Sequence, residues 1–142
     1  MKERVIALGF FDGVHLGHGA LLRRAAEEAA LRGCTPAVFT FDRPPKEVVT
    51  GVPCPLINSP EDRRDLVRRL YRIQDVLMVP FDREMMTTPW DDFIVRILVG
   101  RYHAVHLVAG HDHHFGHRNQ GTPELLAQKC AQLGLGCDII PK

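Results

Sequence analysis

The sequence predicts an α/β fold built around a mostly parallel sheet of about five strands. Two observations support this fold. Short apolar runs typical of buried strands alternate along the chain with segments typical of amphipathic helices. The chain has 142 residues, of which 45% are hydrophobic and 25% charged, as expected for one domain with a sizeable core. A sheet of this kind carries its sites at the carboxyl ends of its strands.

Five segments have the length and apolar character of buried strands. They cover residues 5–8, 36–41, 75–81, 103–110 and 136–141. The two longest irregular segments, 42–58 and 111–121, each follow a predicted strand. We expect both at the functional edge of the sheet, because loops of this length in a compact domain are usually functional.

Four segments are predicted to be helical. The first covers residues 18–32 and ends at Gly33. The other three begin at Ser59, Thr88 and Thr122, each of which is followed by proline. A hydroxyl residue before a proline is typical of a helix N-cap with proline at the first helical position.

The first helix begins differently, at Leu16-Gly17-His18, with no hydroxyl or carboxylate in the capping position. Its unpaired backbone N–H groups therefore need another partner, and an anion would also favour the positive end of the helix dipole. The preceding glycines allow a close approach to a ligand, and His15 and His18 are three residues apart. We interpret this turn as a phosphate site with two imidazole donors. The alternative is a glycine-rich structural turn in which one histidine caps the helix.

Charge and composition argue against several classes of protein. The net charge of +1 is unlike that of a nucleic-acid or membrane-surface binder, and no apolar run is long enough to span a bilayer. The N-terminus does not resemble a signal peptide. The four cysteines lack C-x-x-C spacing, so we interpret them as reduced thiols of a cytoplasmic protein, most of them buried.

Several motifs in order resemble one known family. "GFFDGVHLGH" resembles the His-x-Gly-His motif of nucleotidylyltransferases and, in its fuller form, the FMN adenylyltransferase (FAD synthetase) domain of prokaryotic bifunctional riboflavin kinase/FAD synthetases. "FTFDRPP", "LINSPEDRRDLV" and "VLMVPFDREMMTTPWDDFIVRIL" are similar to the segments that follow in that family. "VAGHDHHFGHRNQGTPELL" resembles its Gly-x-Asp-Phe-x-Phe-Gly loop. The resemblance covers almost the whole chain.

The resemblance implies a Rossmann-like nucleotidylyltransferase fold and the reaction of FMN with ATP to give FAD and pyrophosphate, with Mg²⁺. The implied catalytic residues are His15 and His18, which would contact the ATP phosphates. The nucleotide-binding residues would be Gly9, Phe10, Asp12, Gly17, Gly110, Asp112, Phe115 and Gly116. The flavin side would be formed by Phe41, Asp42, Arg43 and Pro45. ATP and FMN are the expected small-molecule partners, and neither nucleic acid nor a membrane is expected to be one.

The sequence also departs from the family pattern. Residues 1–142 contain neither the family's Ser-Ser-Thr-x-x-Arg phosphate-binding segment nor a riboflavin kinase domain. We therefore expect a single domain with impaired phosphate stabilisation, either part of a longer enzyme or a naturally short member. The family's Pro-His-Pro is Arg43-Pro44-Pro45 here, and His113 stands where the family has phenylalanine.

Two other functions remain as alternatives. The chain could be a non-catalytic flavin- or nucleotide-binding module, or a related nucleotidylyltransferase, such as a cytidylyltransferase, with another acceptor. The histidines of residues 111–117 could hold Zn²⁺, although their spacing favours a solvated loop that faces the nucleotide. The arginine-rich segment "EDRRDLVRRLYR" is interpreted as a charged outer helix face.

Overall fold

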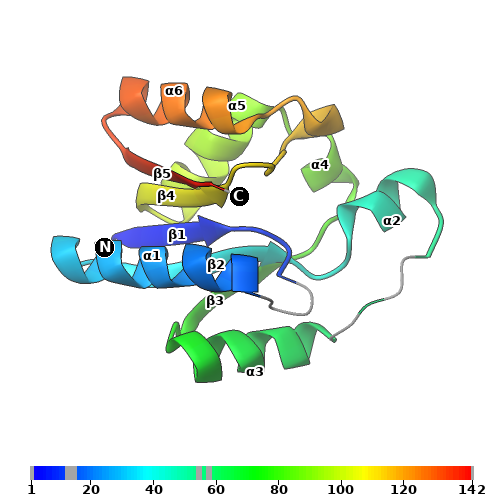
Figure 1. The fold of residues 1–142 in the computed structure, drawn as a ribbon. Coiled ribbons are helices and arrows are strands. Elements are labelled where there is room, and N and C mark those ends of the chain that lie inside the picture. Colours follow the sequence, from blue (N-terminus) through cyan, green and yellow to red (C-terminus); the bar gives the residue numbers. More distant parts are fainter. Residues whose placement is uncertain (1, 12–15, 54–55, 57–58, 142) are drawn as a thin grey trace.

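The structure is a computed structural model that describes residues 2–11, 16–53, 56 and 59–141. Its centre is a five-stranded parallel sheet in the order β3-β2-β1-β4-β5 (Figure 1). The strands are β1 (Arg4–Leu8), β2 (Thr35–Phe41), β3 (Asp75–Val79), β4 (Ala104–Gly110) and β5 (Gly136–Ile140). The α/β fold and all five strands predicted from the sequence are confirmed.

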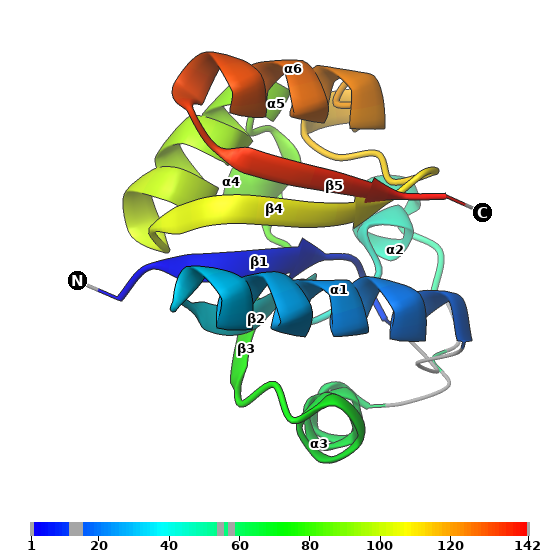
Figure 2. The ribbon, with the colours of Figure 1, turned by 60° about the vertical axis from the view of Figure 1, so that its left-hand side comes forward.

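Helices cover both faces of the sheet (Figure 2). One face carries α1 (Leu16–Arg32) and α3 (Pro60–Tyr71), and the other carries the π-helical element η1 (Phe93–Arg101) and α6 (Pro123–Leu133). The short elements are α2 (Pro45–Thr50), α4 (Arg83–Met86), α5 (Trp90–Asp92) and the 3₁₀ turn η2 (His117–Asn119). Among the described residues, no helix combines the length and the apolar character needed to cross a membrane.

The core forms two layers because side chains alternate between the faces of each strand. On β1, Val5 and Ala7 pack toward α1 and α3, whereas Ile6 and Leu8 pack toward η1 and α6. All four side chains are buried. The strands are therefore continuous apolar runs, as expected for a parallel sheet covered on both faces.

Two of the three predicted helix caps are confirmed. The hydroxyl of Ser59 accepts a hydrogen bond from the Asp62 N–H at 3.1 Å, and that of Thr122 accepts one from Leu125 at 3.2 Å. Gly33 and Gly134 end their helices with φ of 67° and 74°. The end of the first helix at Gly33 is thus placed as the sequence predicts, and α6 ends in the same way at Gly134.

The third predicted cap, at Thr88, is wrong. The Thr88 hydroxyl instead donates to the carbonyl of Glu84 at 2.8 Å, at the end of α4. The sequence reading missed α4, which Asp82 caps by accepting from the Met85 N–H. Segment 42–58, expected to be irregular, contains α2, which has proline at its first position and left-handed Gly51 at its end.

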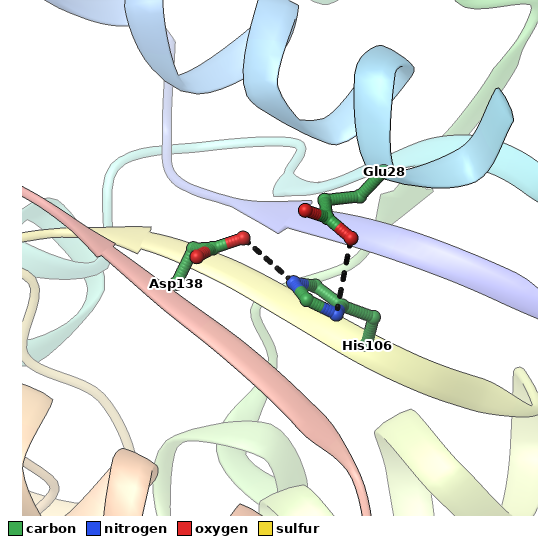
Figure 3. A group of neighbouring side chains, drawn as sticks. All are labelled: Glu28, His106 and Asp138. Atoms are coloured by element: carbon green, nitrogen blue, oxygen red, sulfur yellow. Dashed lines mark hydrogen bonds and ion pairs between the residues drawn. The ribbon is translucent and has the colours of Figure 1, made fainter. Parts of the chain in front are cut away.

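A network of charged groups ties α1 to β4 and β5 (Figure 3). Nε2 of buried His106 lies 2.8 Å from Oδ2 of Asp138, and its Nδ1 faces Glu28 at 3.9 Å. Arg24 donates to both carboxylates, at 3.1 Å from Asp138 and 2.9 Å from Glu28, and Arg32 pairs with Glu28 at 3.3 Å. Two guanidinium groups thus balance the two carboxylates. The three side chains in Figure 3 have the chemistry of metal ligands, but this charge balance makes the cluster a structural ion-pair network.

This network predicts how stability depends on Asp138 and on pH. Burial raises the pKa of the Asp138 carboxyl, but the hydrogen bonds from His106 and Arg24 and the Arg24 charge lower it by more. Ionised Asp138 therefore stabilises the fold above the unfolded-state pKa of about 3.9, and this contribution is lost as pH falls through the lower folded-state pKa. We expect Asp138→Asn to reduce the free energy of unfolding by about 1–2 kcal/mol at neutral pH.

The measurement is urea unfolding of both proteins from neutral pH toward about pH 3, where the difference between them should shrink. Asp65→Asn, an exposed change on α3, is the control and should leave stability unchanged. A constant difference at every pH would contradict this account.

Candidate functional site

A cavity of about 730 Å³ opens at the carboxyl edge of the sheet. Its walls come from the ends of β1 and β2, from α2 and α4, and from the loop that follows β4. In Figure 1 this is the side on which α2 stands and on which α1 begins. The strand order reverses between β1 and β4, and parallel sheets bind their ligands at such a reversal.

Aromatic rings form the apolar wall of the cavity. Rings of Phe41 and Phe81 meet edge-on with centroids 4.8 Å apart, and Phe39 meets both Phe41 and Phe93 at 5.4 Å. Phe93 and Phe115 lie 5.8 Å apart. Because each ring is held by others, the wall is preformed, and its shape suits a flat, largely apolar ligand.

The polar side of the cavity is basic or neutral. It is formed by Lys46, Thr50, His113, His114, His117, Arg118 and Asn119. No carboxylate occurs among the described residues that line the cavity. Burial lowers the pKa of His113 to about 4, against a smaller opposing effect of Asp112, so its ring is neutral at neutral pH. That ring stacks on Phe115 at an interplanar angle of 16°. The cavity thus joins an aromatic wall to a rim that tolerates anions.

The structure brings six of the residues predicted from the sequence to this one cavity. They are Gly9, Phe10, Phe41, Pro45, Phe115 and Gly116. His18 and Gly17 lie in the first turn of α1, and Gly110 ends β4. Asp12 and His15, one of the two predicted catalytic histidines, fall outside the described residues. Those two predictions stay predictions.

Gly9 is required by packing within the protein itself. A Cβ atom at Gly9 would lie 2.7 Å from the ring of Phe11, which is buried. Phe11 has a φ of 61°, an uncommon conformation for a residue with a side chain. The rings of Phe11 and His18 in turn meet edge to face, with centroids 5.1 Å apart. Gly9 and Phe11 therefore link the end of β1 to the predicted catalytic side chain on α1.

Asp42 and Arg43 do not line the cavity, although both were predicted on its flavin side. The Asp42 carboxylate accepts a hydrogen bond from the Phe81 N–H at 3.0 Å, so it ties the end of β2 to the segment after β3. Arg43 is exposed. The sequence located this loop at the functional edge but did not reveal that Asp42 has an internal partner.

The loop after β4 is held by its own backbone. Phe115 and Gly121 exchange two hydrogen bonds, and the His117 N–H donates to the carbonyl of Thr88 at 2.8 Å. Gly116 has a φ of 78° and lies against the backbone of Trp90. In this loop the described histidines do not gather with a third metal ligand, so zinc binding finds no support there.

Sequence reasoning missed Arg63. The segment that contains it was interpreted as a charged outer helix face, yet Arg63 is only 1% exposed. It lies one helical turn before buried Val67, on the face of α3 that packs on the sheet. That spacing was the available signal, because residues four apart share a helix face.

Comparison with known proteins identifies the family. The model of the family described as FAD synthetase matches residues 1–142. The chain belongs to the FAD synthetase family. The resemblance inferred from the motifs is thereby confirmed.

The curated proteins to which this chain is similar are described as bifunctional riboflavin kinase/FMN adenylyltransferases. The protein of Escherichia coli K12 is 35% identical over 137 residues, which make up 95% of this chain and 42% of that protein. The protein of Bacillus subtilis is 31% identical over 142 residues, or 99% and 44% of the two chains. The protein of Listeria monocytogenes is 33% identical over 128 residues, or 89% and 40%. This chain thus spans about two fifths of the length of the curated relatives that it matches.

Solved structures support the same fold. A protein from Streptococcus pneumoniae described as a macrolide-efflux protein aligns with a TM-score of 0.83 and 25% identity, over 99% of this chain and 45% of that one. A protein from Thermoplasma volcanium described as a lipopolysaccharide core biosynthesis protein aligns with a TM-score of 0.56 and 20% identity, over 99% and 96% of the two chains. The second likeness concerns the fold alone.

Gly116 offers a direct test of the loop that lines the cavity. A Cβ atom there would lie 2.6 Å from Cα of Trp90, in a conformation open almost only to glycine. We expect Gly116→Ala to cost about 3 kcal/mol of stability and to weaken ligand binding in the cavity.

Gly51→Ala is the matched control, because Gly51 also has a left-handed φ of 73° but nothing lies within 4 Å of its added Cβ. It should cost only about 1 kcal/mol. Equal losses in chemical unfolding would show that neither the contact with Trp90 nor the extended ψ of Gly116 adds to the cost.

Proposed function

We propose that this chain is an FMN adenylyltransferase. It transfers the AMP group of ATP to the phosphate of FMN, giving FAD and pyrophosphate. The observation that carries this proposal is the cavity at the strand-order reversal, which joins an aromatic wall to a basic rim in a chain of the FAD synthetase family. A flavin and a nucleotide both combine a flat ring system with phosphate, so the cavity matches the chemistry of these substrates.

The flavin ring is assigned to the aromatic wall. Phe41 and Pro45 line the cavity beside Phe81, and burial of a planar ring among them would supply most of the apolar contact. Asp42 and Arg43 would support this side indirectly. The Asp42 carboxylate holds the end of β2 by accepting a hydrogen bond from the Phe81 N–H, and Arg43 follows it in the same loop. Lys46, the first cation after this segment, lines the same cavity, and its ammonium group would attract the FMN phosphate.

The nucleotide is assigned to the β1–α1 turn and to the loop after β4. The first turn of α1, a helix of 17 residues, offers backbone N–H groups and the positive end of its dipole to the ATP phosphates. Gly9, Phe10, Asp12 and Gly17 belong to this side. Gly110, Asp112, Phe115 and Gly116 would contact the adenosine part.

The reaction is a displacement at the α-phosphorus of ATP. An oxygen of the FMN phosphate attacks in line, a new P–O bond forms, and the bond to pyrophosphate breaks with the electron pair leaving on the pyrophosphate oxygen. His15 and His18 would donate hydrogen bonds to oxygens that gain negative charge in the transition state. Mg²⁺ bound to the ATP phosphates would neutralise part of the negative charge that develops on the leaving pyrophosphate.

The direct test is to incubate the protein with FMN, ATP and Mg²⁺ and to measure FAD and pyrophosphate. We expect the two products in equal amounts. Binding of both ligands without product would favour the alternative of a non-catalytic flavin- or nucleotide-binding module. Product with CTP in place of ATP, or with an acceptor other than FMN, would favour a related nucleotidylyltransferase.

A substitution of His18 tests the assigned transition-state contact. We expect His18→Ala to lower kcat about 100-fold, as is typical when one donor to a developing oxyanion is removed. His111→Ala is the control, since His111 is exposed and does not line the cavity. It should retain wild-type turnover. Equal ATP affinity and equal turnover in wild type and His18→Ala would overturn the assignment.

A further inference from the structure

One buried side chain joins the β1 loop, of which residues 9–11 are described, to the β2 loop, residues 42–44, beside the cavity. Arg63 on α3 is 1% exposed and is among the largest fully buried side chains of the described chain. Its Nη1 donates to the carbonyl of Phe10 at 2.9 Å, and its Nη2 donates to the carbonyl of Asp42 at 3.2 Å. One guanidinium group therefore bonds the backbone of both loops.

Thr40 completes this arrangement from β2. Its hydroxyl donates to the same Phe10 carbonyl at 2.8 Å and lies 3.2 Å from Nη1 of Arg63. The Arg63 guanidinium also lies over the ring of Phe10, 4.2 Å from its centroid. Phe10 is thus held at its carbonyl by two donors and at its ring by a cation, while the same residue lines the cavity.

The chemistry of these contacts requires arginine. A planar guanidinium presents donors in a fixed fork, so it can bond two carbonyls that lie in different directions. A lysine ammonium is a compact point charge on a flexible stem and cannot reproduce that fork. Burying a cation is costly unless hydrogen bonds compensate for the loss of water. The buried Arg63 guanidinium therefore depends on the positions of the two loop carbonyls that accept its hydrogen bonds.

We infer that Arg63 is a positioning residue of the catalytic site. It sets the separation between the β1 loop, which leads into the proposed phosphate site, and the β2 loop, which forms the proposed flavin side. This inference rests on the proposed function, because it assigns the two loops to the two substrates. Arg63 touches neither substrate and acts through the backbone of Phe10 and Asp42.

This role predicts a separation of kinetic effects. The groups that contact the substrates remain when Arg63 is changed, so ground-state binding should be little affected. In-line transfer, however, depends on the alignment of acceptor and phosphate, and displacements of about 1 Å can cost about 100-fold in rate. The loss should therefore appear in kcat and not in KM.

The test uses three variants of the whole chain. Arg63→Lys keeps the charge but removes the fork. Thr40→Val keeps the shape of the side chain and removes only its hydroxyl, so it spares the buried cation if Arg63→Lys fails to fold. Arg69→Lys is the control, because Arg69 is exposed on the same helix. We expect kcat to fall about 30-fold in Arg63→Lys and about fivefold in Thr40→Val, with KM values for ATP and FMN within about threefold of wild type.

Amide hydrogen exchange supplies a readout that does not depend on activity. In both test variants, the amides of residues 9–11 and 41–46 should exchange at least about tenfold faster, whereas peptides from β4 and α6 should not change. The variants could show faster exchange in only these two regions while the wild-type protein forms no FAD. That result would support the role of Arg63 in positioning the loops but would refute the proposed function. Unchanged exchange in those two regions, or wild-type kcat in a folded Arg63→Lys protein, would overturn the inference.

Discussion

The loops after β1 and β4 diverge because the chain extends its sheet from β1 to β2 and β3 on one side and then to β4 and β5 on the other side of β1. The connections on the two sides pass over opposite faces, so their loops separate at this point and leave a cavity between them. The rest of the site depends on this constraint. The β1 loop, the β2 loop and the loop after β4 meet at this edge only because all five strands are parallel.

Two kinds of internal contact then fix the loops around the cavity. Glycines bring segments close together because they lack a Cβ atom, as where Phe11 packs on Gly9 and where Gly116 meets Trp90. Buried charge holds segments that are distant in sequence, as Arg63 does for Phe10 and Asp42. Further along α1, the ion pair between Arg24 and Asp138 attaches the same helix to β5. The helix that presents the proposed phosphate site is thus anchored along its length.

Much of the fold could be predicted from the sequence because its signals are local. Apolar runs, proline after a hydroxyl residue and glycine after a helix each report on a few neighbouring residues, and the caps at Ser59 and Thr122 form as expected. Thr88 carries the same signal but bonds to Glu84, because α4 ends directly before it. A local motif cannot reveal that the capping side chain already forms a hydrogen bond with a neighbouring helix.

Those parts of the candidate site that depend only on residue type and on position relative to a strand could be predicted from the sequence. Phe41 ends β2 and Phe115 lies in the loop after β4, and the topology brings both to one edge. The partners of Arg63 and Asp42 could not be predicted, because each bond joins segments that only the tertiary fold brings together.

The central claim is that one cavity holds the flavin and directs its phosphate toward a nucleotide at the start of α1. The most direct measurement is a crystal structure of the chain with FMN and a non-hydrolysable ATP analogue. The account predicts the flavin ring among Phe41, Phe81 and Phe93, with the triphosphate at the first turn of α1. A flavin bound elsewhere while the cavity stays empty, or a triphosphate remote from that turn, would contradict it.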